Sequence, residues 1–377
     1  MSITVRSIFE MLSVELWREI FEYFTTNELW FSFRGLNRKI DAILNQTTLH
    51  LNFKKKDNYC YFMKNILPLI NVNNVRSLKF EKANEIQHFF SKYSLNSFVQ
   101  LRLLSLDFMY SFNDNSFIFW NQLSSLKYLQ FLNIMIWTNF IPDNCIEEKE
   151  FLIRSIFNND YCPSLKSLII RIPGRQKGMP INPPLMSVTK TTNIKYLWID
   201  SLVFSDFIKL LPGLQNVQSL RTKDEYCYNK FNAQQLKMTF TMPLLLKCIQ
   251  LNLTLLDDKT FEHVEYFLRH TSNLKDLFLW GWYHLLDARK WEILLSVYCL
   301  KLIKFELVCT GHIGGDNFHQ AIDDFEQTCK TIPFWLERNV TITDDEDFSG
   351  HDYRDDVVVR FNIKKVSFSS ELSFRIT

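Results

Sequence analysis

The sequence is poor in glycine, with only 9 glycines among 377 residues. Loops that cradle phosphate groups depend on glycine, so this scarcity argues against a nucleotide-dependent enzyme. The eight cysteines are scattered and never form a Cys-x-x-Cys pair, which excludes the usual zinc-knuckle spacing and gives no sign of a disulfide framework. We therefore expect buried free thiols, and neither a metal nor another cofactor.

Long apolar runs and an excess of either charge are also missing. No apolar run approaches the 18 residues that a membrane helix needs, and charged residues interrupt the apolar pattern of the N-terminus. Lysine and arginine (43) nearly balance aspartate and glutamate (41), so no overall field favours nucleic acid. We expect an intracellular protein, cytoplasmic or nuclear, without a membrane or nucleic-acid partner.

Hydrophobic residues are plentiful, at 47% of the chain, and phenylalanine alone occurs 34 times. This composition is close to the globular average and suits thick, layered packing. A chain of 377 residues is too long for one compact core of ordinary size. We expect two or three domains, or one elongated repeat array.

The N-terminal segment carries the pattern of three short helices. An apolar stripe with a spacing of four, flanked by Trp17 and Phe21, runs through Leu12, Leu16, Ile20 and Phe24. Ser13 can cap this first helix, and Thr25 to Glu28 supplies turn and N-cap residues for the next. The apolar spacing then resumes at Leu29, Phe33, Leu36, Ile40 and Leu44. Gly35 and Asn37 can interrupt it, so we expect separate helices over residues 29–33 and 38–44.

This segment resembles an F-box over about a tenth of the chain. The likeness follows Leu12-Ser13-Val14-Glu15-Leu16, Ile20-Phe21, Tyr23-Phe24, Glu28-Leu29, Phe33, Leu36-Asn37-Arg38 and Leu44. The family usually has proline where Ser13 stands and often tryptophan where Ile40 stands, although serine also starts helices well. The resemblance implies a segment that binds the Skp-type adaptor, and through it the cullin scaffold, of an SCF ubiquitin ligase.

The resemblance also implies which residues bind the adaptor. They are Leu12, Leu16, Ile20, Phe24, Leu29, Phe33 and Leu36, shared between the motif's own core and the interface. Recognition of a helix in a groove fits such a stripe. The alternative is that the helices only cover the N-terminal end of a repeat array, because such arrays need an end cover.

A five-residue phrase recurs beyond Leu49: a small polar residue, an aliphatic residue, a basic or amide residue, any residue, and an aliphatic residue. Copies begin at Asn74, Gln100, Ser125, Ser164, Asn193, Asn216, Leu245, Asn273 and Lys301. Most intervals are 23 to 29 residues, the range of leucine-rich repeats, and one of 39 residues predicts an insertion around Ile141 to Glu150. A further apolar residue two places later, as at Phe80 and Phe131, gives each copy the alternation of a strand.

Amphipathic stretches between the copies predict helices over residues 85–93, 148–157, 205–211, 260–269 and 289–298. Repeats of a strand and a helix build a curved parallel sheet with the helices outside it. After the last copy we expect a helix from Phe318 to Leu336, broken near Pro333. Strands at 340–343, 357–363 and 366–376 would then close the array.

Two features of the repeats point to a partner. One cation stands at the same place in most copies, as Arg76, Arg102, Lys127, Lys166, Lys195, Lys247 and Lys275. This column could attract an acidic segment, or it could be a solvated sheet edge. Aromatic residues alternate with core leucines and should project from the open sheet face, unless the C-terminal tail covers them. The target-binding residues we expect are therefore Lys195, Trp198, Lys275, Phe278 and Trp280.

Histidines offer little for catalysis. Gly311-His312-Ile313-Gly314-Gly315-Asp316, with His319 further on, is the candidate for a metal or base site, but no partner for it can be identified by spacing. We interpret it as a glycine-rich loop that leaves the last repeat. We expect His263 and His270 to lie on a helix surface.

The sequence thus predicts an α/β chain in three parts: a three-helix F-box over residues 1–48, an irregular leucine-rich-repeat-like solenoid over 49–310, and a C-terminal helix and β cap over 311–377. We expect a substrate receptor of an SCF-type ligase that holds a protein target and performs no covalent chemistry. The alternative is a repeat-protein scaffold or inhibitor without a link to ubiquitin. The few glycines and the lack of a catalytic motif argue against an enzyme.

Overall fold

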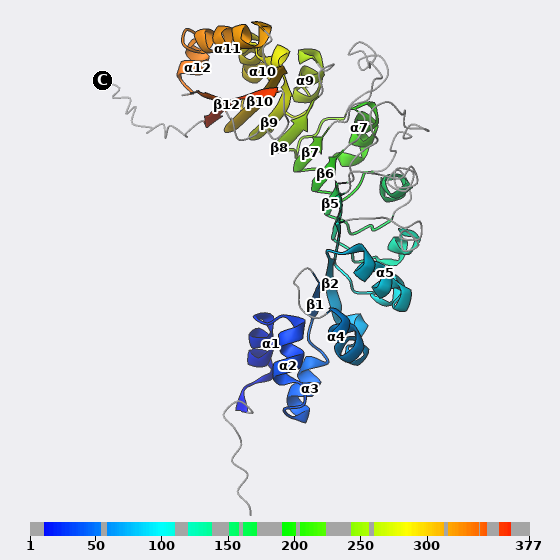
Figure 1. Cartoon of the computed structure of the whole chain (residues 1–377). Coiled ribbons are helices and arrows are strands. Elements are labelled where there is room, and N and C mark those ends of the chain that lie inside the picture. Colours follow the sequence, from blue (N-terminus) through cyan, green and yellow to red (C-terminus); the bar gives the residue numbers. More distant parts are fainter. Residues whose placement is uncertain are drawn as a thin grey trace, which may run out of the picture. The chain divides into compact units, whose positions relative to one another are not determined.

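The computed structural model describes residues 11–53, 59–109, 120–137, 151–157, 161–171, 191–200, 204–223, 243–255, 260–312, 316–338, 340–344 and 354–362. The chain divides into two compact units, one from residues 1–175 with 192–194 and one from residues 176–191 with 195–377. In each unit parallel strands alternate with helices (Figure 1). The fold is therefore α/β and is compatible with a solenoid-like repeat.

Three helices begin the first unit: α1 (Val14–Glu22), α2 (Thr26–Phe33) and α3 (Arg38–Leu44). The Ser13 hydroxyl caps α1, Thr25 and Glu28 form a capping box on α2, and Asn37 caps α3. Gly35 has a φ of +81°, a value that glycine adopts without strain. The predicted break at Gly35 and Asn37 and the predicted helix over residues 38–44 are confirmed.

The core of these helices lies beside the predicted stripe. Its buried side chains are Trp17, Phe21, Leu29, Trp30, Ile40, Ile43 and Leu44. The rings of Trp17 and Phe21 lie 5.5 Å apart, and Phe33 packs 5.2 Å from Phe21. Leu16 and Phe24 consequently stay on the outside of the helices.

The first unit continues with five parallel strands in chain order: β1 (Leu49–Asn52), β2 (Val75–Phe80), β3 (Leu103–Met109), β4 (Phe131–Trp137) and β5 (Ser167–Arg171). The register aligns a row of buried leucines, Leu78, Leu104, Leu132 and Leu168. The strand β1 was not predicted, although its residues alternate between buried and exposed. Such rows form the apolar core that repeat packing requires.

Short helices connect these strands. They are α4 (Tyr59–Tyr61), the π-helical η2 (Phe62–Ile66), η3 (Leu67–Leu69), η4 (Val72–Asn74), α5 (Ala83–Lys92), η5 (Leu95–Ser97), η6 (Trp120–Ser125) and a helix over residues 151–157. Phenylalanine rings pack between helix and strand, with Phe89 of α5 5.0 Å from Phe80 of β2. The helix predicted over residues 85–93 is confirmed within two residues at its start.

The second unit has the strand order β6-β7-β8-β9-β10-β12-β11. The parallel strands are β6 (Tyr196–Asp200), β7 (Ser219–Lys223), β8 (Gln250–Thr254), β9 (Asp276–Trp282) and β10 (Lys304–His312). Strand β12 (Arg354–Asn362) runs antiparallel along β10, and β11 (Thr341–Asp344) runs antiparallel along β12. Two of the three predicted C-terminal strands are therefore confirmed, and residues 366–376 lie outside the described residues.

Helices accompany the strands of this unit in Figure 1. They are α7 (Phe204–Leu210), η7 (Leu211–Leu214), α9 (Phe261–Leu268), η8 (Tyr283–Leu285), α10 (Ala288–Tyr298), α11 (Asp316–Cys329) and α12 (Pro333–Leu336). The break predicted near Pro333 is confirmed, since Pro333 begins α12. The buried Trp335 donates from Nε1 to the Ala288 carbonyl at 3.1 Å, which fastens α12 to the start of α10.

The asparagines of the recurring phrase have a structural role. The Nδ2 atoms of Asn74, Asn193 and Asn273 donate to the carbonyl oxygens of Asn45, Pro163 and Leu246, at 2.6, 3.1 and 2.7 Å. Each bond joins a strand entry to a turn 27 to 30 residues earlier in the chain. Asparagine therefore recurs because it satisfies a turn carbonyl, of the preceding repeat for Asn193 and Asn273 and of the turn after α3 for Asn74.

The predicted register of two copies is wrong. Phe131 pairs with Leu103 and Ser167, so Leu132 occupies the core and Gln130, not Lys127, precedes the strand. In the same way Gln250 pairs with Ser219, so Ile249, not Lys247, precedes β8. The cation column is therefore interrupted. The true strand entry lies three residues after the predicted one in the first of these copies and two residues after it in the second. The predicted insertion around residues 141–150 lies outside the described residues.

Two smaller expectations are also wrong. His263 is buried and does not lie on the helix surface. It forms a capping box with Thr260 at the start of α9. Cys60 is exposed, whereas the other described cysteines, Cys162, Cys248, Cys299, Cys309 and Cys329, are buried. Burial raises the pKa of the Cys162 and Cys248 thiols to about 12.

Candidate partner-binding surfaces

Large apolar side chains stay exposed on α1 and α2 and in the turns that follow them; we call these residues together the N-terminal apolar patch. It consists of Leu16, Tyr23, Phe24, Phe31 and Leu36, all exposed. The Phe24 ring lies 5.2 Å from Phe33, which brings the end of α1 against the end of α2. Large exposed apolar side chains gathered on one small unit indicate a site for a protein partner.

The seven residues predicted to bind an adaptor differ in exposure. Leu16, Phe24 and Leu36 are exposed, while Leu12, Ile20 and Phe33 are half-buried. Leu29 is buried with the helix core, so it supports the patch from below and cannot touch a partner directly. Tyr23 and Phe31 are exposed but were not predicted. Phe31 is exposed although it follows the buried Trp30, because a helix turns adjacent residues to different faces, and its ring stacks on Tyr61 of α4 at 5.2 Å.

Polar contacts hold the edges of this patch. The pKa of the Glu15 carboxyl lies below its usual range, first because of a backbone hydrogen bond at the start of α1 and then because of the Ser13 hydroxyl. Lys39 donates from Nζ to the Leu12 carbonyl at 2.8 Å, which ties α3 to the residues that precede α1. These contacts order the helix starts around the apolar side chains.

A second surface lies on strands β6 to β10, on the sheet face opposite the buried leucines. The register aligns Trp198, Arg221, Asn252, Phe278 and Glu306 in one row, and Asp200 and Trp280 belong to the next row. Trp198, Phe278 and Trp280 are half-buried. The Trp198 Nε1 donates to Asp200 Oδ1 at 2.6 Å, and the Arg221 guanidinium lies over its ring.

Lys195 and Lys275, the predicted cations of the target site, lie one residue before β6 and β9. Both are exposed. The Lys195 carbonyl accepts the amides of Gln218 and Ser219 at 2.7 and 3.0 Å, which fixes the backbone at the strand entry. The two lysines therefore lie at the entry edge of the strands, next to the row of aromatic residues rather than within it.

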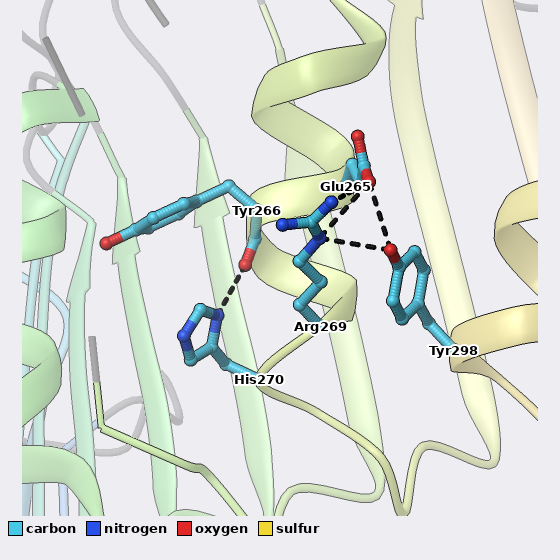
Figure 2. Close-up of polar contacts among 5 residues, drawn as sticks. All are labelled: Glu265, Tyr266, Arg269, His270 and Tyr298. Atoms are coloured by element: carbon cyan, nitrogen blue, oxygen red, sulfur yellow. Dashed lines mark hydrogen bonds and ion pairs between the residues drawn. The ribbon is translucent and has the colours of Figure 1, made fainter. Parts of the chain in front are cut away.

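A groove of about 560 Å³ lies between α9 and α10. Its walls include Phe261, Glu265, Ile293, Val297 and Tyr298. Figure 2 shows the polar cluster at its side, where Tyr298 donates to Glu265 Oε1 at 3.0 Å and Arg269 contacts both. The carboxylate of Glu265 raises the pKa of Arg269 further above its usual range. This cluster joins the two helices beside an apolar groove.

The histidine-containing segment is split between two elements. Strand β10 runs through Gly311 to His312, residues 313–315 lie outside the described residues, and His319 is exposed on α11. Within the described residues no three histidine, cysteine, aspartate or glutamate side chains gather as metal ligands. In the same part of the chain no helix is long and apolar enough to cross a membrane.

Comparison with known proteins adds no family. Neither the models of known protein families nor the curated proteins contain a match to this sequence. The assignment of the surfaces above is therefore based on the geometry of this structure alone.

Proposed function

We propose that this chain is the substrate-recognition subunit of an SCF-type ubiquitin ligase. In this proposal residues 1–48 act as an F-box that binds the Skp-type adaptor and, through it, the cullin scaffold. The leucine-rich-repeat-like solenoid over residues 49–310, closed by the cap over 311–377, holds a protein target. The chain performs no covalent chemistry and needs no cofactor, because other subunits transfer the ubiquitin.

The N-terminal apolar patch is the observation that carries the proposal. The helices bury their own aromatic core and still expose Leu16, Phe24 and Leu36. Helices that served only to seal a repeat array would face their apolar residues toward the array and leave a polar outer surface. An exposed apolar stripe on capped helices fits recognition by a groove in a partner.

Adaptor binding tests the proposal. We expect Leu16→Asp with Leu36→Asp to abolish co-purification of a Skp-type adaptor, because two charges would enter an apolar interface. Their exposures of 46% and 60% mean that the changes leave the helix core intact. The matched control is Val99→Asp, exposed to 47% outside these helices, which should bind normally. Adaptor capture that survives the double change would remove the F-box from the proposal.

One contact favours the alternative of a scaffold or inhibitor whose helices only cap the array. Thr26 of α2 donates from Oγ1 to the His50 carbonyl of β1 at 3.1 Å, so the helices do cover the first strand. Both roles are physically compatible, since α2 contacts β1 while α1 keeps its apolar side free. A chain that never captures adaptor but still captures a target would belong to this second class.

A further inference from the structure

Exposed aliphatic side chains gather where the chain enters strands β8 and β10 of the second unit; we call this surface the strand-entry strip. Its apolar members are Leu244, Leu246, Ile249, Leu300 and Ile303. Its cations, all exposed, are Lys247, Lys275, Lys301 and Lys304. Contact with water explains why the lysines are exposed, but it does not explain why the aliphatic side chains are exposed beside them.

Backbone hydrogen bonds fix the geometry of the strip. Lys275 donates its amide to the Ile249 carbonyl at 2.9 Å, and Ile303 donates its amide to the Lys275 carbonyl at 2.8 Å. The three residues are therefore neighbours on adjacent chains of the sheet, each separated by about 5 Å. Ile249 and Ile303, exposed to 39% and 43%, thus stand about 10 Å apart with Lys275 between them.

The charges around this arrangement are unequal. Lys247 and Lys301 donate to the amide oxygens of Asn216 and Asn273, which are neutral partners that leave the lysine charges in place. Lys304 pairs with Glu306, and within the described residues the side-chain ammonium of Lys275 makes neither a hydrogen bond nor an ion pair. The strip is therefore cationic at its centre and apolar on both sides.

We propose that the strand-entry strip binds an acidic, apolar segment of a partner protein, with an acidic residue at Lys275 and apolar residues on Ile249 and Ile303. A polyproline-II chain has three residues per turn and advances about 3.1 Å per residue, so two apolar residues three positions apart lie on the same side of it, about 9 Å from one another. The acidic residue lies between them. Charge complementarity selects this partner over a basic one and makes the binding sensitive to salt.

This site differs from the row of Trp198 and Phe278 on the sheet face, and it does not depend on adaptor binding. The lysines alone would be explained by contact with water. The apolar residues beside them are the reason to propose a partner at this edge. The two surfaces meet at Lys275, so variants at Ile249 and Ile303 separate them.

A peptide selection tests the strip directly. The full chain is used to select from a displayed library of random 12-residue peptides, and the enriched peptides are measured by fluorescence anisotropy. We expect enriched peptides to carry two apolar residues three apart with an aspartate or glutamate between them. The triple variant Ile249→Ser, Lys275→Glu and Ile303→Ser should bind these peptides at least tenfold more weakly than the wild type does. Binding to the wild type should also weaken as salt is raised.

The matched control is Tyr128→Ser with Lys166→Glu, which alters an exposed aromatic residue and an exposed lysine of the first unit and should bind as the wild type does. Circular dichroism shows whether the triple variant folds; if it does not, Lys275→Glu alone should still weaken binding several-fold. The proposal fails if no peptide is enriched, if the enriched peptides are not acidic, or if they bind the triple variant equally. It also fails if the strip binds only vesicles that contain phosphatidylserine, which would identify a membrane surface instead.

Discussion

Arg221 covers the ring of Trp198 across two neighbouring strands. The guanidinium carbon lies 3.8 Å from the ring centroid, and the two residues are partners in the register of β6 and β7. The same indole is held by Asp200 on its own strand. Trp198 is therefore ordered before any partner arrives, which reduces the entropy that binding costs.

This order favours the aromatic row as the dominant part of the predicted target site. We expect Trp198→Ala with Trp280→Ala to weaken target capture far more than Lys195→Ser with Lys275→Ser. Buried aromatic anchors contribute about 2 kcal/mol or more each, whereas exposed lysine pairs contribute less than about 1 kcal/mol. Quantitative co-purification at low and high salt measures the difference.

Lys275 also belongs to the strand-entry strip, so Lys195→Ser alone is the cleaner control for the sheet face. It should change mainly the salt dependence of capture. If the Trp198→Ala with Trp280→Ala variant captured targets as well as the wild type does, the target site would lie elsewhere.

The capping box of α2 gives a prediction about local stability. Thr25 and Glu28 satisfy one another's backbone amides at 3.3 and 2.7 Å. We expect Thr25→Ala to destabilise α2 by about 1 kcal/mol, because the Glu28 amide at the helix start loses its acceptor, the Thr25 hydroxyl. Hydrogen exchange of peptides from α2 measures this directly.

Ser32→Ala is the matched control for this change, because Ser32 is exposed on the same helix and away from its start. It should leave exchange almost unchanged. Equal protection in the two variants would mean that packing of Leu29 and Trp30 alone holds the helix.

Local sequence chemistry was sufficient to predict the starts and stops of elements. Ser13 and Asn37 act as caps, Gly35 ends the second helix, and Pro333 begins the last. Ser13 and Asn37 act through a side-chain acceptor for a helix amide, and Gly35 and Pro333 act through the backbone preference of the residue. Such preferences operate over one turn of chain, so they are readable without knowledge of the rest of the fold.

The register of the repeats could not be read in the same way. Ser125 to Leu129 fits the phrase as well as the true strand entry does, and the difference lies in which residues pair with Leu104 and Leu168. A shift of three residues places Phe131 outside and Leu132 inside. The register depends on which residues of neighbouring repeats pair, so it cannot be read from the sequence of a single copy. The strand-entry strip is not predicted from the sequence for this reason: the copy that begins at Leu245 ends on Ile249 and so places it with the core residues.

Thiol reactivity should separate Cys60 from the buried cysteines. Burial raises the pKa of Cys248 to about 12, so at pH 8 only about one thiol in ten thousand is a thiolate there, and the thiolate is the reactive form. We expect iodoacetamide to label Cys60 quickly and Cys162, Cys248 and Cys299 slowly. Labelling of the buried thiols should rise as pH increases toward 12. Peptide mass spectrometry resolves each site.

Labelling in urea is the control for this experiment, because unfolding removes the burial that raises the pKa and should equalise the rates. Rapid labelling of Cys248 in the folded protein would show that the segment before β8 opens frequently.

Gly311 allows the close approach of α11 to the end of β10. A Cβ atom at this position would overlap the ring of Phe318, which is buried in α11. We expect Gly311→Ala to destabilise the second unit by about 1–3 kcal/mol, because the backbone or the ring must shift within a packed core. Urea unfolding followed by circular dichroism measures the loss.

A double-mutant cycle distinguishes this steric account from a catalytic or metal role for the glycine-rich segment. Phe318→Leu removes the ring and should itself be destabilising, but it leaves room for a Cβ at Gly311. Gly311→Ala should therefore cost much less in the Phe318→Leu background than in the wild type, with a coupling energy of at least about 0.5 kcal/mol. His319→Ala, which alters an exposed residue one position along the same helix, should change stability little. Strict additivity of the Gly311 and Phe318 changes would mean that glycine is needed there for a reason other than the ring.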